Sequence, residues 1–176
     1  MLELEGRYHL RNQKPFPSGD ATLEDIARWF LDRAKAILSA DGYHVIVVAL
    51  FPNDNAPHFM ELQPDDQADK YVLMRKLATE VKRIRAHTIV LVAEVWVAKF
   101  DKNHPFRHAV EAPDRTEAIN VIAASRTGRS VVLTLPFERI EKKISFSEAE
   151  DVAIDQGNIN LLSPVLQAWK EMASSG

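Results

Sequence analysis

The residues that decide the fold are 88–100, which read TIVLVAEVWVAKF. Apolar side chains fill both alternating rows of this stretch, because Ile89 and Leu91 belong to one row and Val90 and Val92 to the other. A strand with one face in water would alternate apolar with polar residues instead. The pattern therefore predicts a strand that is buried on both faces and lies in the centre of a sheet.

A helix is predicted over residues 22–41. Thr22 and Asp25 have the spacing of a capping box, and an apolar stripe at helical spacing follows them. Gly42 permits the left-handed turn that ends many helices. Further helices are expected to begin at residues 64–66, where acids favour a helix N-terminus, and at Ser163, which precedes a proline.

The remaining strands are expected on either side of the second helix. Turn residues separate residues 43–51 from 58–62 and residues 118–125 from 130–137, so each pair predicts an antiparallel hairpin. Pro136 predicts that the last of these strands lies at an edge or bends, because proline cannot donate to a ladder. Residues 140–146 are expected to continue the sheet.

These elements predict an α+β fold in one domain, residues 1–176, with an extended N-terminal arm at residues 1–20. The element order is α-β-β-α-β-β-(β)-α, and the mainly antiparallel sheet has about five strands flanked by helices. Residues 147–160 fit either a short helix or a turn.

Composition excludes several classes of function. The chain has 176 residues, a formal net charge of -3 and no cysteine, so it has no disulfide, Cys-ligated zinc, iron–sulfur cluster or thiol nucleophile. Acids and bases are interspersed, which disfavours nucleic-acid binding. No apolar run approaches the roughly 18 residues of a membrane span. We therefore expect a cytoplasmic protein that does not enter a membrane.

Glu94 is a carboxylate within the most apolar strand of the chain. If it is buried, desolvation raises its pKa and makes it a candidate catalytic acid or base. The alternative is structural: its face opens to solvent near the end of the strand, or an arginine pairs with it.

The long connection over residues 101–117 holds the other candidate residues. Imidazole and carboxylate groups are suitable ligands for a divalent metal, and they recur there at Asp101, His104, His108 and Glu111. With Glu94, Asp101 is also a catalytic candidate. Pro105 favours an extended loop, which would separate the two histidines. A loop of this length is itself typical of functional segments.

Residues 93–96, AEVW, and 113–118, PDRTEA, resemble a pattern in bacterial and phage hypothetical proteins. The resemblance covers roughly residues 85–135 and implies an intracellular prokaryotic or phage protein, with no activity attached. It suggests a pairing of Glu94 with Arg115 across adjacent strands. Together with Arg107 in the loop, it makes the following residues candidates for binding: Trp96, Arg107, Asp114, Arg115 and Glu117.

The function favoured by these observations is a non-enzymatic binding or scaffold domain without a cofactor. We expect it to form a homo-oligomer through a sheet edge or a helix face, with residues 101–117 as its contact surface, and an unidentified protein partner is a further expectation. The alternative is a metal-assisted hydrolase or nuclease that draws its ligands from residues 94–117.

Overall fold

The structure, a computed structural model, describes residues 16–17, 20–53, 56–105, 107–141, 143–148, 151–155 and 160–174, without the side chains of residues 67 and 68. Most of the predicted N-terminal arm, residues 1–15 and 18–19, lies outside the described residues.

The described residues form an α+β fold built on a seven-stranded sheet. Its strands follow the order β2-β1-β3-β4-β5-β6, with β7 paired to β5, and every pairing is antiparallel. The strands are β1 (Ile46–Phe51), β2 (His58–Leu62), β3 (Thr88–Val97), β4 (Thr116–Ser125), β5 (Ser130–Ile140), β6 (Lys143–Phe146) and β7 (Asp151–Ile154).

The sheet is larger than the predicted five strands because the chain returns twice along β5. Strand β6 pairs with residues 137–140 of β5, and β7 pairs with residues 131–134. Pro136 falls in the interval that neither short strand pairs with, so its missing N–H leaves no gap in those ladders. Sequence reasoning does not assign β7, since three of its four side chains are exposed and carry little pattern.

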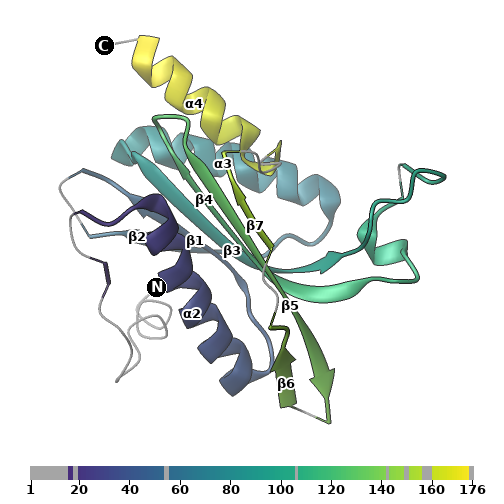
Figure 1. Cartoon of the computed structure of the whole chain (residues 1–176). Helices are drawn as coiled ribbons and strands as arrows, with labels where there is room; N and C mark the ends of the chain where they lie inside the picture. Colours follow the sequence, from purple (N-terminus) through teal and green to yellow (C-terminus); the bar gives the residue numbers. More distant parts are fainter. Residues whose placement is uncertain are drawn as a thin grey trace.

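Helices cover both faces of the sheet, as Figure 1 shows. Helix α2 (Leu23–Asp41) packs on one face, while α3 (Gln67–Ile84) and α4 (Ser163–Ser174) pack together on the other. Each helix buries an apolar stripe against the strands, which removes apolar surface from water. Two separate cores result, and the central strands contribute alternate residues to each.

Local signals set the ends of α2 as predicted. The hydroxyl of Thr22 accepts a hydrogen bond from the Asp25 N–H at 3.1 Å, and the Asp25 carboxylate accepts one from the Thr22 N–H at 2.9 Å. Gly42 then ends the helix with φ at 78°. The capping box and the glycine stop are both confirmed.

Strand β3 is central, between β1 and β4. Its first six residues are buried on both faces, but the last four, from Glu94 onward, are half-buried or exposed. The two-sided core therefore ends at Glu94, and the strand continues beyond it. None of the helices in the described part of the chain combines the length and the hydropathy that a membrane crossing requires.

Candidate functional site

Three charged side chains meet where the sheet extends past the end of α2. Arg139 donates through Nη2 to Oε2 of Glu94 at 2.7 Å and through Nη1 to Oε1 of Glu117. Arg139, Glu94 and Glu117 come from β5, β3 and β4, respectively. On each of these strands, a residue two positions away from the charged one belongs to the core under α2. The apolar face of the sheet thus continues as a polar one, because alternate residues of a strand share a face.

Backbone groups beyond the C-terminus of α2 complete this network. The His44 N–H donates to Oε1 of Glu94, and Arg139 Nη2 also donates to the Gly42 carbonyl at 3.3 Å. Desolvation alone would lower the pKa of Arg139, but its hydrogen bonds to Glu94 and Glu117 raise it above its ordinary value. The guanidinium therefore remains charged, and both carboxylates are held as its ionic partners.

The predicted pairing of Glu94 with Arg115 is wrong. Glu94 pairs with Arg139 instead, whereas the Arg115 guanidinium lies over the ring of Trp96, 5.1 Å from its centroid. Arg115 Nη1 also donates to the Val110 carbonyl at 2.8 Å. Of the two interpretations of Glu94, the geometry agrees with the structural one, since the residue lies where the core ends and an arginine pairs with it.

Trp96 and Arg115 together form an exposed aromatic and cationic surface. The Trp96 side chain is 43% exposed although its strand is central. Stacking of a guanidinium on an indole keeps the ring oriented while leaving one side accessible. Trp and Arg are the residue types that most often dominate binding energy at protein interfaces. Both were singled out from the sequence, although their stacking was not foreseen.

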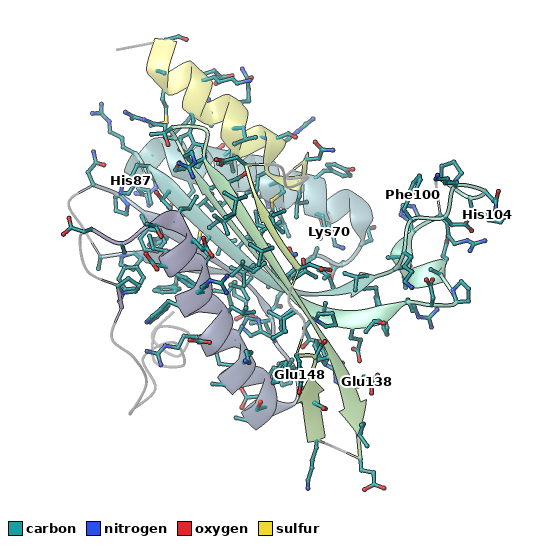
Figure 2. The ribbon with its side chains drawn as sticks, in the orientation of Figure 1. Lys70, His87, Phe100, His104, Glu138 and Glu148 are labelled. Carbon is teal, nitrogen blue, oxygen red and sulfur yellow. The ribbon has the colours of Figure 1, made fainter. Side chains whose placement is uncertain are left out.

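Beyond this surface, residues 98–115 form the β3–β4 loop, which projects away from the sheet and its helices in Figure 1. Phe100 and His104, labelled in Figure 2, lie on this projection. The Phe100 side chain is 75% exposed, and that of Val110, in the 3-10 helix η1 (Ala109–Glu111), is 52% exposed. Exposed apolar side chains are typical of contact surfaces where they form a contiguous patch.

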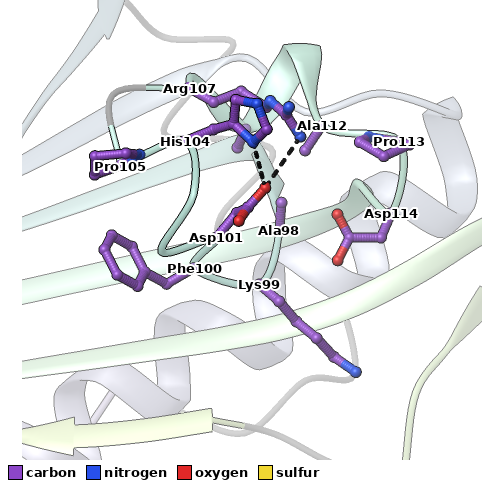
Figure 3. Close-up of a pocket in the computed structure, with 11 residues that line it drawn as sticks. Ala98, Lys99, Phe100, Asp101, His104, Pro105, Arg107, Ala112, Pro113 and Asp114 are labelled. Carbon is purple, nitrogen blue, oxygen red and sulfur yellow. Dashed lines mark hydrogen bonds and ion pairs between the residues drawn. The ribbon is translucent and has the colours of Figure 1, made fainter.

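Asp101 organises the first half of this loop, as Figure 3 shows. One of its carboxylate oxygens contacts His104 Nδ1 at 2.8 Å and Arg107 Nη1 at 3.5 Å, while the other accepts a hydrogen bond from the Asn103 N–H at 2.9 Å. The hydrogen bond with His104, followed by the one from Asn103, lowers the pKa of Asp101. Asp114 lies across a cavity of about 520 Å³ that these side chains line.

The candidate metal ligands are only partly brought together. Asp101 and His104 are in contact, but His108 precedes η1 and Glu111 ends it. Among the described residues, no group of three or more histidine, aspartate or glutamate side chains is arranged to hold a metal. The metal site therefore stays a prediction.

Asp101 leads to a testable titration. We expect a carbon-detected NMR titration to place its pKa below that of an ordinary aspartate, about 3.9. The pKa of Asp101 is lower in the folded state than in the unfolded state. The interaction therefore stabilises the fold fully at a pH above the unfolded-state pKa, and this stabilisation is lost as the pH falls through the folded-state pKa. His104→Ala should raise the pKa of Asp101 toward the ordinary value, whereas His108→Ala should leave it unchanged. Equal effects of the two variants would contradict the assignment.

Arg139 is the residue of this site that sequence reasoning missed. Its link to Glu94 joins residues 45 apart in the chain, so no local pattern contains both. A signal was nevertheless present: if the hairpin at Gly128 is continued in register, Phe137 falls opposite Glu117, and Arg139 follows on the same face.

A family model described as bacteriophage lambda protein ea47 matches residues 3–175. The chain belongs to this family. The resemblance to phage proteins is thereby confirmed at the level of the family. Protein ea47 of Escherichia phage lambda is 23% identical over 108 residues, which are 60% of this chain and 26% of that relative. The matched segment thus spans about a quarter of the phage lambda protein. No solved structure gives a significant match.

The ea47 family description and the name of the phage lambda relative state no activity.

Proposed function

We propose that this chain is a non-enzymatic binding domain that self-associates through the β3–β4 loop. The observation that carries the proposal is the exposure of Phe100 and Val110 on a loop whose two ends are central strands of the sheet. Rigid strands hold the loop in place, so less conformational freedom is lost when it binds.

A second copy of the chain is the partner that the charges of the loop favour. Residues 98–115 contain four Lys or Arg and three Asp or Glu. In a two-fold symmetric dimer the same surface meets itself, so a loop with charges of both signs can place each against its opposite. A strongly acidic or basic loop would repel its own copy. Trp96 and Arg115, at the base of the loop, would form the edge of the interface.

The charge contacts of the carboxylates favour binding over catalysis. Glu94 is held by the permanent charge of Arg139, and Asp101 is shared by His104 and Arg107. The metal-assisted hydrolase is supported only by the Asp101–His104 pair among the described residues, and a catalytic metal ordinarily has three protein ligands. A cytoplasmic location is part of the proposal, supported by the absence of cysteine.

Analytical ultracentrifugation over a range of protein concentrations tests the proposal. We expect the wild-type chain to sediment as a concentration-dependent dimer and Phe100→Ser/Val110→Ser to weaken the association at least tenfold. Tyr71→Ser is the matched control, because Tyr71 is 61% exposed on α3 and is not part of the loop. A wild-type chain that stays monomeric at every concentration would overturn the proposal, as would equal weakening by the control.

A further inference from the structure

A cavity of about 850 Å³ lies at the end of the sheet opposite the β3–β4 loop. It is formed where β1 and β4 end and where β3, β5 and α2 begin. His87, labelled in Figure 2, lies at this end of the sheet, near the start of α2. The volume is within the range of about 300–1,000 Å³ that is usual for small-molecule sites.

One wall of the cavity is aromatic. The ring of Phe16 stacks on that of Phe51, with centroids 5.6 Å apart and planes 23° apart, and it meets Trp29 edge to face at 5.1 Å. Phe51 and Trp29 are buried, whereas Phe16 is 37% exposed. Phe16 is therefore fixed by two aromatic neighbours while part of its surface remains accessible, which suits stacking against a planar ring.

The end of the sheet beside Phe51 carries hydrogen-bonding groups, because Thr88 pairs with Phe51 of β1 and with Ser125 of β4. His87 Nδ1 contacts the Thr88 hydroxyl at 2.8 Å, and the Ser125 and Thr127 hydroxyls are 2.7 Å apart. Burial, and secondarily the charge of Arg126, lowers the pKa of His87, which favours the neutral imidazole. A neutral imidazole and hydroxyl groups recognise uncharged donors and acceptors.

The charges that line the cavity are already compensated, which argues against an anionic ligand. Arg129 Nε lies 2.6 Å from a carboxylate oxygen of Asp155. Glu24, in the first turn of α2, pairs with Arg28 Nη2 at 2.9 Å. A phosphate would meet these acids without an uncompensated cation among the described lining residues.

We propose that this cavity binds an uncharged nucleoside. Its base stacks on Phe16 and hydrogen-bonds to His87, and its sugar hydroxyls face Ser125 and Thr127. An aromatic wall next to a row of neutral hydrogen-bonding groups matches the two chemically different parts of such a molecule. The site is remote from the self-association loop and does not depend on it.

Isothermal titration calorimetry with adenosine, guanosine, cytidine and uridine, each compared with its 5′-monophosphate, tests the inference. We expect at least one nucleoside to bind with a Kd below 1 mM, which corresponds to a binding free energy of about −4.1 kcal/mol. It should bind at least fivefold more tightly than its monophosphate. Phe16→Ala should weaken binding about tenfold, and Thr127→Val should weaken it by a smaller factor. Tyr71→Ala, outside the cavity, should bind as the wild type does.

Three results would overturn the inference. They are the absence of heat with all four nucleosides, tighter binding of the monophosphate than of the nucleoside, and unchanged binding by both Phe16→Ala and Thr127→Val. Circular dichroism shows whether each variant is folded. The two variants remove different contacts, so the test stands if either of them folds.

Discussion

Phe30→Ala is expected to lower the free energy of unfolding by about 3–5 kcal/mol, the usual cost of deleting a fully buried phenylalanine ring. Phe30 has no exposed surface in the core under α2. Its ring contacts Phe51 of β1 and Phe59 of β2, with centroids 6.3 and 6.2 Å away. The substitution therefore leaves a cavity between α2 and the β1–β2 hairpin. Since domains are commonly stable by about 5–15 kcal/mol, much of the total would be lost.

Urea unfolding followed by circular dichroism measures this loss. Phe100→Ala is the matched control, because it makes the same chemical change where the ring is 75% exposed, and its effect should stay within about 0.5 kcal/mol. Both variants are compared at a protein concentration low enough to avoid self-association. A loss from Phe30→Ala no larger than that from Phe100→Ala would show that the α2 face is not the packed core described above.

Arg139→Met is expected to destabilise the fold by roughly 1–2 kcal/mol. The substitution keeps an aliphatic chain but leaves Glu94 and Glu117 without their shared cation. Breaking a fully buried pair costs about 3–5 kcal/mol. The expected loss is smaller here because the side chains of Glu94 and Arg139 retain 23% and 33% exposure, which lets water compensate part of the charge.

A second substitution separates charge from packing in this prediction. Adding Glu94→Gln to Arg139→Met removes one of the two carboxylate charges and keeps an oxygen that accepts from the His44 N–H. We therefore expect the double variant to regain part of the stability that Arg139→Met loses. Arg28→Met is the control, since its exposed pair with Glu24 should be worth only about 0.3–0.5 kcal/mol. If Arg139→Met costs no more than Arg28→Met, the network is not a structural element.

The elements that could be predicted are those whose causes are local. Thr22, Asp25 and Gly42 act within one turn of α2, and the apolar rows of β3 need no partner to be recognised. The same is true of the hairpin between β1 and β2, which the structure confirms. The small strands β6 and β7 differ, because they exist through pairing with β5 rather than through a pattern of their own.

The contacts of the candidate residues differ from the predicted ones. Glu94, Trp96 and Arg115 do lie together where β3 leaves the core, as the resemblance suggested. Arg115, which was expected to pair with Glu94, stacks on the indole of Trp96 instead. The ion pair with Glu94 is made by Arg139. Arg115 ends the β3–β4 loop, whereas Arg139 belongs to β5.

By itself the sequence determined the class of the fold, the ends of α2 and the two-sided burial of β3, because capping and side-chain alternation are properties of neighbouring residues. It also excluded a cysteine nucleophile from these 176 residues, since they contain no cysteine. Only the tertiary structure decided the partner of Glu94. The β4–β5 hairpin and its register bring residue 139 beside residue 94, and that proximity depends on the pairing of whole strands.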